Sequence, residues 1–376
     1  MKVLSVFGTR PEAIKMAPVV QALNNAPDMD SIVCVTAQHR DMLDQVLTLF
    51  QITPDEDLDL MQPGQSLHAL TARVIKGMQA VFEKHQPDVV LVHGDTTTTF
   101  ATTLAAFYSR IPVGHVEAGL RTGDMTAPFP EEANRVLADR LCHYFFPPTE
   151  KAAENLRKEN IPNPQIWVTG NTVIDALLWV RDAIKGTPFT PETYGSAAKV
   201  ISDPSHKILL VTGHRRESFG GGFERICTAL STLAKKYPSL QIIYPVHLNP
   251  RVQEPVHRLL SGISNIHLIQ PLDYRDFVRL MDRSYIILTD SGGIQEEAPA
   301  LDKPTLVMRN VTERPEGITA GVVKLVGTEI QSIVDCTSLL IDNPSEYTKM
   351  KCSVNPYGDG QASMRIVEAL RGGSPE

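Results

Sequence analysis

The chain has 376 residues, of which 42% are hydrophobic, and a formal net charge of −7 with a pI near 5.9. That length predicts two domains, and the hydrophobic fraction is ordinary for a globular chain with large cores. The acidic balance argues against broad binding to nucleic acid or to an anionic membrane, so basic residues should form local clusters that serve a small anion.

The cysteines and the chain start point to a compartment. The five cysteines are scattered and never spaced as CxxC, which favours reducing surroundings and argues against structural zinc. The apolar run after Lys2 is too short for a signal peptide, and no run approaches the roughly 20 apolar residues of a membrane-spanning helix. We therefore expect a soluble, cytoplasmic protein.

The chain opens with a predicted strand, residues 2–7, followed by the turn Gly8-Thr9-Arg10 and a helix. Backbone N–H groups at the start of that helix, with Arg10 and Lys15 close by, suit a phosphate or diphosphate. The alternative interpretation is that Lys15 is simply a solvated helix residue. The turn has neither a GxGxxG nor a Walker A sequence, which disfavours dinucleotide binding and P-loop hydrolysis.

Two further apolar strands end in acidic residues. Residues 88–93 lead into Gly94-Asp95-Thr96, and residues 111–116 lead into Glu117. Ligands of open parallel sheets bind outside the carboxyl ends of the strands, so Asp95 and Glu117 lie where chemistry is expected. For Asp95, the alternative interpretation is a helix N-cap.

A proline-stiffened loop at residues 128–130 precedes Glu131 and Glu132, which open the next helix. Carboxylates suit the positive end of a helix dipole, so Glu132 could serve only the helix start. The acidic segment Asp57-Leu58-Asp59 is similar to a metal-binding DxD motif. Because it follows no clear strand, we interpret it as solvated surface.

The second half repeats the plan of the first. Residues 207–217 match residues 2–12 in register, and residues 286–290 correspond to residues 89–95. The sequence thus predicts an α/β protein with two separate parallel sheets, helices on both faces, and a cleft between the halves. Turn-forming residues place the linker near residues 185–205.

Two further segments are expected to form helices. Residues 169–175 are expected to end a strand and start a helix that closes the first half. The amphipathic helix 362–370 could pack on either half.

Two loops of the second half carry polar groups. His214 follows a predicted strand in a basic, glycine-rich turn, where it could donate to a phosphate or shuttle a proton. Ser291-Gly292-Gly293 exposes N–H donors at a helix start, and a glutamate one turn further could accept from two ribose hydroxyls. An ordinary capped helix is the alternative. Residues 309–316 add another arginine.

These motifs together resemble the non-hydrolysing bacterial UDP-N-acetylglucosamine 2-epimerases. The likeness runs in order through essentially the whole chain, on the motifs GTRPE (8–12), GDT (94–96), HVEAG (115–119), PEEANR (130–135), GHRRE (213–217) and DSGGIQEE (290–297).

The resemblance implies a glycosyltransferase-B-like fold with two Rossmann-like domains facing a central cleft. We expect a first domain at residues 1–185, joined by a C-terminal helix at about 360–376, and a UDP-binding domain at residues 200–358. It also implies a homodimer that reversibly converts UDP-N-acetylglucosamine to UDP-N-acetylmannosamine for bacterial surface polysaccharide synthesis.

The resemblance also assigns site residues by position. Asp95, Glu117 and Glu131 match the proposed catalytic carboxylates of the family, and His214 joins them in the expected catalytic set. The expected contacts to the UDP-sugar are Arg10, Lys15, Asp95, Glu117, His214, Leu272, Phe277, Ser291, Gly292, Gly293, Glu297 and Arg314. Leu272 can offer only a main-chain contact. Relatives also bind a second UDP-N-acetylglucosamine as an activator, and the matching residues here are Gln38, Gln65, Arg216 and His247.

The family's chemistry explains this set of residues. UDP leaves C1 while a base removes the C2 proton, giving 2-acetamidoglucal, and UDP adds back after protonation on the other face. The diphosphate needs cations and N–H donors, and the two faces of C2 need two acid/base groups. Neither a cofactor nor a metal is expected.

Three rival functions remain at this point. A glycosyltransferase of the same fold would need an acceptor site. A hydrolysing epimerase would release UDP and N-acetylmannosamine. A nucleotide-sugar sensor would bind without catalysis.

Overall fold

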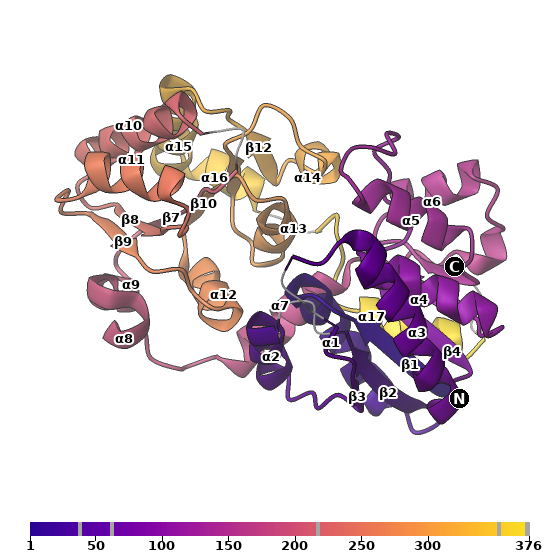
Figure 1. Cartoon of the computed structure of the whole chain (residues 1–376). Helices are drawn as coiled ribbons and strands as arrows, with labels where there is room; N and C mark the ends of the chain where they lie inside the picture. Colours follow the sequence, from indigo (N-terminus) through magenta and orange to yellow (C-terminus); the bar gives the residue numbers. More distant parts are fainter. Residues whose placement is uncertain (37–39, 61–63, 216–218, 352–354, 373–376) are drawn as a thin grey trace. The chain divides into compact units, whose positions relative to one another are not determined.

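The computed structural model describes residues 1–36, 40–60, 64–215, 219–351 and 355–372. The chain divides into two compact units (Figure 1). The first comprises Met1–Ala176 and Tyr357–Glu376, and the second comprises Leu177–Pro356.

The first unit alternates strands with helices around one parallel sheet, whose strand order is β3-β2-β1-β4-β5-β6. Its strands are β1 Lys2–Phe7, β2 Asp30–Val35, β3 Glu56–Asp57, β4 Val89–His93, β5 Val113–Val116 and β6 Tyr144–Phe146. Its helices are α1 Arg10–Asn24, α2 Arg40–Leu49, α3 Leu67–His85, α4 Thr97–Tyr108, α5 Glu131–Asp139, α6 Glu150–Lys158, η1 Asn163–Gln165 and α17 Ala362–Leu370, and α7 Thr172–Ala183 leads into the second unit.

The second unit has the same organisation, with the strand order β12-β11-β10-β7-β8-β9. Its strands are β7 Ile208–Thr212, β8 Gln241–Pro245, β9 Ile266–Ile269, β10 Ile286–Thr289, β11 Thr305–Val307 and β12 Val323–Leu325. Its helices are α8 Pro191–Tyr194, η2 Gly195–Ala197, α9 Ala198–Ser202, α10 Gly221–Lys236, α11 Pro250–Leu260, α12 Tyr274–Arg283, α13 Gly292–Ala300, α14 Pro315–Thr319, α15 Ile330–Asp342 and α16 Pro344–Met350.

The two sheets share one topology. Numbered from the start of its own unit, each sheet has the order 3-2-1-4-5-6, which is the Rossmann order. The chain reverses direction across the sheet between the first and fourth strands, which are β1 and β4 in one unit and β7 and β10 in the other. The predicted α/β fold with two Rossmann-like domains is therefore confirmed.

The central strands form because their sequences suit burial on both faces. Every residue of β4 is buried, and four of its five residues are Val or Leu, as expected for a central parallel strand. On one face of the first sheet, Val90 and Val92 pack with Val74 and Met78 of α3. This packing fixes where β4 ends, and so where the residues after it emerge.

The C-terminal helix α17 packs in the first unit, against α1. Asp175 of α7 accepts hydrogen bonds from the backbone N–H groups of Ala362 (3.3 Å) and Ser363 (2.8 Å), the first two residues of α17. A carboxylate at a helix start satisfies otherwise unpaired donors and complements the dipole. Asp175 therefore attaches the end of the chain to the first unit.

Two local details differ from expectation. Asp57 and Asp59 are exposed, as expected for solvated surface, but a short strand does reach this segment, since Glu56 and Asp57 pair with the end of β2. The expected strand before Thr169 is reduced to one bridge between Phe145 and Ile166, because the chain leaves the sheet edge at once. Both elements lie at sheet edges, where pairing on one side alone tolerates a short strand.

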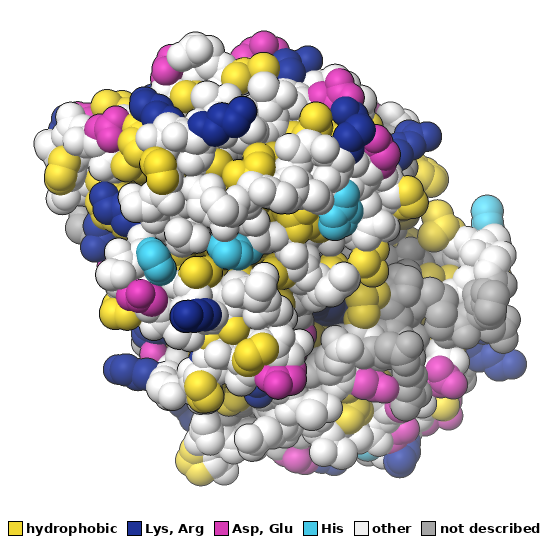
Figure 2. Space-filling model, turned by 90° about the vertical axis from the view of Figure 1, so that its left-hand side faces the viewer, with side chains coloured by type: hydrophobic (Ala, Val, Ile, Leu, Met, Phe, Trp, Pro, Cys, Tyr) yellow, Lys and Arg dark blue, Asp and Glu magenta, His cyan; other side chains and the backbone are white. Residues whose placement is uncertain are grey.

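None of the helices in the described part of the chain has the length and apolar character needed to cross a bilayer. On the face drawn in Figure 2, acidic, basic and hydrophobic side chains are interspersed. The cysteines that the structure describes, Cys34, Cys142, Cys227 and Cys336, are free thiols.

Candidate functional site

The turn after β1 is held by a buried carboxylate. Glu12 accepts from the backbone N–H groups of Gly8 (3.1 Å) and Thr9 (2.7 Å) and from the Thr96 hydroxyl (2.7 Å). Burial raises the pKa of Glu12, although these hydrogen bonds act in the opposite direction. Gly8 is required, because a Cβ there would lie 2.1 Å from the Thr36 hydroxyl oxygen. The turn thus presents Arg10 at the first position of α1.

Glu117 lies at the tip of β5 in the left-handed region, with φ of +66°. This backbone conformation is uncommon for a residue with a side chain and clusters at functional sites. The Glu117 carboxylate pairs with Lys15 of α1, and His93 Nε2 of β4 lies 3.2 Å from its Oε2. Burial alone would raise the pKa of Glu117, but Lys15 and His93 hold it well below its usual value. Glu117 is therefore an ionised carboxylate, and Lys15 is not a freely solvated helix residue.

Asp95 follows the tip of β4, directly after Gly94, and its side chain forms an ion pair with Arg135 of α5. The Asn134 amide donates to the Asp95 carbonyl (2.9 Å). Helix α5 therefore holds both the main chain and the side chain of Asp95. The N-cap of α4 is Thr96 and not Asp95, since the Thr96 hydroxyl accepts from Thr99 N–H at 3.2 Å. The Asp95 carboxylate is therefore not used in capping.

Two adjacent glutamates open α5 and have different surroundings. Glu132 is buried and accepts from the backbone N–H groups of Thr122 and Gly123, each at 3.0 Å, which ties down the preceding loop. The half-buried Glu131 carboxylate makes no hydrogen bond or ion pair with any residue in the described ranges. Glu132 thus has a structural role, and Glu131 is the carboxylate left available for a ligand.

In the second unit, Asp290 organises the turn after β7. Its fully buried carboxylate accepts from the backbone N–H groups of His214 and Arg215, each at 2.8 Å. The other oxygen of Asp290 lies 3.3 Å from His214 Nδ1. The His214 ring also stacks on His247, with centroids 5.5 Å apart.

The surroundings of His214 determine its charge. Burial lowers the pKa of His214, Asp290 acts in the opposite direction, and His247 and Arg215 lower it further. The ring is thus neutral near pH 7, with Nδ1–H facing Asp290 and Nε2 left as an acceptor. A neutral imidazole can take up a proton or accept a hydrogen bond.

This balance predicts how His214 titrates. We expect a midpoint below the ordinary 6.5, a higher midpoint in His247→Phe, which keeps an aromatic ring but removes a titrating one, and a lower midpoint in Asp290→Asn. Two-dimensional ¹H–¹⁵N spectra of the histidine rings across pH measure all three. A parent midpoint at or above 6.5 would contradict the assignment.

The start of α13 is open. In the described part of the chain, the Ser291 side chain makes no capping hydrogen bond, and a Cβ placed on Gly293 would meet no atom within 4 Å other than those of its chain neighbours and its own helix backbone. The first N–H groups of this helix therefore face space that a ligand can enter. Unpaired N–H groups at a helix start form an anion site, which is the arrangement predicted for a diphosphate.

Two glutamates one turn into α13 are buried and held by named partners. Glu297 accepts from the Tyr274 hydroxyl at 2.7 Å, and Glu296 pairs with Arg314, the residue before α14. Arg309 forms a two-pronged pair with Glu313, at 2.8 and 3.1 Å.

The remaining expected residues are spread over the two units. Leu272 and Phe277, both half-buried, lie just before and within α12, and Gln65 of the first unit accepts from Arg73. His247 is the exposed partner of His214. Gln38 and Arg216 lie outside the described residues.

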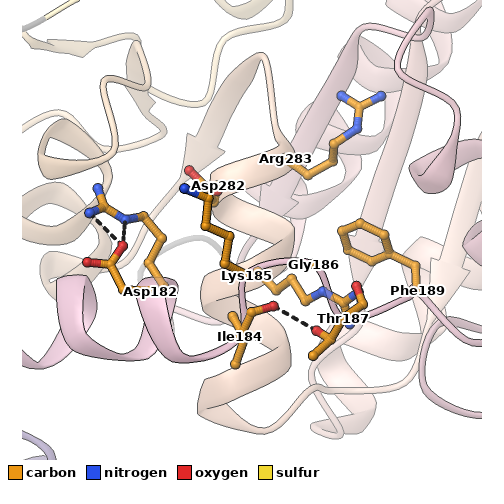
Figure 3. A pocket seen from close by; sticks show the side chains of 10 residues that line it. Asp182, Ile184, Lys185, Gly186, Thr187, Phe189, Asp282 and Arg283 are labelled. Carbon is orange, nitrogen blue, oxygen red and sulfur yellow. Dashed lines mark hydrogen bonds and ion pairs between the residues drawn. The ribbon is translucent and has the colours of Figure 1, made fainter.

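A pocket of about 560 Å³ in the second unit, between α7 and α12, contains none of the expected site residues (Figure 3). Its arginines serve the chain itself. Arg279 lies over the Phe189 ring at 4.0 Å and donates to the Thr187 carbonyl, and Arg283 donates to the carbonyls of Ile201 (2.9 Å) and His206 (3.1 Å). These contacts attach the segment before β7 to α12. The arginines of this pocket therefore have a structural role.

No group of three or more His, Cys, Asp or Glu side chains suited to a metal ion occurs among the described residues.

Sequence reasoning missed the partners of the acidic strand tips. His93 is the last residue of β4 and is buried, with Nε2 3.2 Å from Glu117 Oε2. Arg135 lies in the motif PEEANR, and nothing in that motif specifies its ion pair with Asp95. A histidine ending an otherwise aliphatic strand next to Gly-Asp was the available signal for His93.

Each of the two units has the Rossmann-like fold that is typical of proteins that bind nucleotides. The chain belongs to the UDP-N-acetylglucosamine 2-epimerase family, whose model matches residues 21–371.

The relatives agree over nearly the whole length. The UDP-N-acetylglucosamine 2-epimerase of Yersinia pestis is 60% identical, over 99% of this chain and 98% of its own. The crystal structure of the Neisseria meningitidis enzyme bound to UDP-GlcNAc matches with 52% identity and a TM-score of 0.86, covering 99% of this chain and 100% of that one. The Methanocaldococcus jannaschii enzyme in complex with UDP-GlcNAc and UDP matches with 32% identity and a TM-score of 0.77, covering 99% and 100% of the two chains.

Proposed function

We propose that this chain interconverts UDP-N-acetylglucosamine and UDP-N-acetylmannosamine by inverting C2 of the sugar. The observation that carries the proposal is the pair of carboxylates at adjacent strand tips, Asp95 after β4 and Glu117 after β5, with Glu131 at the start of α5. Membership in the epimerase family supports it.

The reaction is an elimination followed by an addition. A base removes the C2 proton while the C1–O bond to UDP breaks, so that the electron pair of the C2–H bond forms the C1–C2 double bond of 2-acetamidoglucal. UDP takes the electrons of the broken bond. A proton delivered to the other face of C2 and return of UDP to C1 complete the inversion.

The surroundings of the carboxylates suggest a division of labour. Glu117, whose pKa is held low by Lys15 and His93, stays anionic and so suits stabilisation of positive charge developing at C1. Asp95 and Glu131 are then the groups for proton exchange at C2, with the neutral ring of His214 as a further acid/base group.

The UDP moiety is proposed to bind the second unit. The start of α13 at Ser291, Gly292 and Gly293 offers N–H donors to the diphosphate, with Arg10, Lys15, His214 and Arg314 as charged or polar partners. Phe277, Glu297 and the main chain at Leu272 are proposed for the uridine.

Incubation with UDP-N-acetylglucosamine alone, followed by ¹H and ³¹P NMR, tests this function. We expect a mixture of the two intact UDP-sugars, with the same final ratio from either starting side. Release of UDP and free N-acetylmannosamine would indicate the hydrolysing reaction. Conversion only with a sugar acceptor would indicate a glycosyltransferase, and binding without any conversion would indicate a sensor.

Gly293→Ala separates ligand binding from folding. Alanine favours a helix over glycine by up to about 1 kcal/mol, and a methyl group on Gly293, the second residue of α13, would meet no atom of another described element within 4 Å. The same methyl group would occupy the space proposed for the diphosphate. We therefore expect a higher free energy of unfolding by denaturant together with UDP binding weakened about tenfold or more by calorimetry. Unchanged UDP affinity would place the diphosphate elsewhere.

We further propose that a second UDP-N-acetylglucosamine activates the enzyme through Gln38, Gln65, Arg216 and His247. The stacking of His247 on His214 supports this, because it connects a proposed activator residue to the proposed catalytic set. Full turnover of UDP-N-acetylmannosamine without added UDP-N-acetylglucosamine would remove the idea.

We also propose that the protein works as a cytoplasmic homodimer and supplies surface polysaccharide synthesis, as its resemblance to the family implies. Sedimentation velocity tests the dimer.

A further inference from the structure

A fully buried histidine lies behind the acidic strand tips of the first unit. His115 of β5 has no exposed surface, and each of its ring nitrogens faces an oxygen. Nδ1 lies 2.6 Å from Asp139 Oδ1, and Nε2 lies 2.7 Å from the Gly94 carbonyl oxygen. A carbonyl oxygen can only accept, and so can the carboxylate of Asp139, so His115 faces a hydrogen-bond acceptor at each ring nitrogen.

Asp139 joins this ring to two other groups. Its Oδ2 accepts from Arg121 Nη2 at 2.7 Å and from the backbone N–H of Gly119 at 3.3 Å. Burial alone would raise the pKa of Asp139, but His115 and Arg121 hold it below its usual value. Arg121 is held in turn by Glu159 at 2.7 Å. The cluster thus joins His115, Asp139, Arg121 and Glu159 through directed hydrogen bonds.

The location of Asp139 is unfavourable for α5 alone. It is the last residue of that helix, where a negative charge opposes the dipole. Burying a carboxylate there also requires charged partners. Because the helix dipole and burial both disfavour a carboxylate at this position, we infer that Asp139 serves contacts outside α5.

The cluster contacts the backbone near two of the proposed catalytic carboxylates, and it includes the last residue of the helix that begins with the third. The Gly94 carbonyl directly precedes Asp95, and the Gly119 N–H lies two residues after Glu117. Asp139 itself ends the helix that begins with Glu131. One hydrogen-bonded group therefore connects the tips of β4 and β5 with α5.

We propose that His115 and Asp139 are positioning residues, which set the spacing of Asp95, Glu117 and Glu131 by holding the three elements that carry them. The inference rests on the proposed epimerase function. It assigns no contact with substrate to either residue.

Two variants test the proposal. In His115→Gln the side-chain amide can donate to Gly94 or to Asp139 but cannot replace both donors at their distances. In Asp139→Asn the ring and Arg121 lose their shared anionic partner. Because a displacement of about 1 Å in a catalytic group can cost about 10²-fold in rate, we expect kcat to fall by about that factor in His115→Gln, with KM and UDP affinity changed less than about threefold.

Asp175→Asn is the matched control. Like Asp139, Asp175 is a buried carboxylate of the first unit that accepts from the backbone. Asp175 holds the start of α17, however, and contacts no strand tip. We expect the substitution to lower the midpoint of thermal unfolding with kcat unchanged. If kcat per folded molecule were unchanged in His115→Gln as well, His115 would be structural only and the proposal would be overturned.

A second readout uses the parent protein alone. Selective ¹⁵N labelling of the histidines should show one ring whose two nitrogens both take part in hydrogen bonds, one of them with Asp139. A His115 ring without these hydrogen bonds would overturn the proposal. A parent without epimerase activity would remove the proposed function and this inference together, whereas an active parent with an unaffected His115→Gln would remove only the inference.

Discussion

Glu117→Gln is expected to lower kcat by about 10²–10⁴-fold, because preorganised charge at the reacting centre and proton transfer by positioned groups each contribute on that scale. Glutamine keeps the length of the side chain and tolerates the φ of +66° as well as glutamate does, so the tip of β5 should keep its shape. The substitution removes the negative charge of a carboxylate that Lys15 and His93 keep ionised. Steady-state kinetics in both directions measure the change.

Two comparisons sharpen this result. UDP affinity should change little, because Glu117 is proposed to act on the sugar. Glu83→Gln, on an exposed position of α3, removes the same charge away from any strand tip and should leave kcat as in the parent. A Glu117→Gln enzyme that keeps more than about a tenth of the parent kcat would contradict the role given to this carboxylate.

Asp290→Ala is expected to affect both stability and activity. The fully buried carboxylate accepts from two backbone N–H groups and faces His214 Nδ1, so its removal leaves these donors without their acceptor. We expect the free energy of unfolding to fall by about 2–4 kcal/mol, since a polar group left unpaired costs about 1–3 kcal/mol. Loss of the fixed His214 should also lower kcat/KM by at least about 10²-fold.

Denaturant unfolding and steady-state kinetics check both parts of this prediction. Asp290→Asn keeps one acceptor oxygen and should recover part of the stability. Asp335→Ala, on an exposed position of α15 in the same unit, should change stability by no more than about 0.5 kcal/mol. If Asp290→Ala were as stable as Asp335→Ala, the turn after β7 would not depend on this carboxylate.

The strand tips could be predicted because they depend on local pattern. The runs at residues 2–7, 88–93 and 286–289 are rich in β-branched and aliphatic residues, and each is followed by a glycine or an acidic residue that ends the strand. A buried strand needs that composition wherever it occurs, so its carboxyl end can be located without knowing its neighbours. The matching register of the two halves then predicted their common topology.

The partners of the site could not be predicted, because they depend on where separate elements come together. His115 and Asp139 are 24 residues apart, and nothing in either segment specifies their contact. Glu131 and Glu132 are adjacent, yet successive helix positions point about 100° apart, so one is buried under the loop and the other is not. Choosing between them requires the path of residues 118–130.

The exchange of hydrogen at C2 tests the central claim most directly. UDP-N-acetylglucosamine is incubated with the protein in D₂O and C2 is followed by NMR and mass spectrometry. We predict that UDP-N-acetylmannosamine formed without any acceptor carries deuterium at C2, and that deuterium also enters the recovered starting sugar. Product that keeps its original hydrogen at C2, or bound sugar that never exchanges, would contradict proton removal and return by the carboxylates of the first unit.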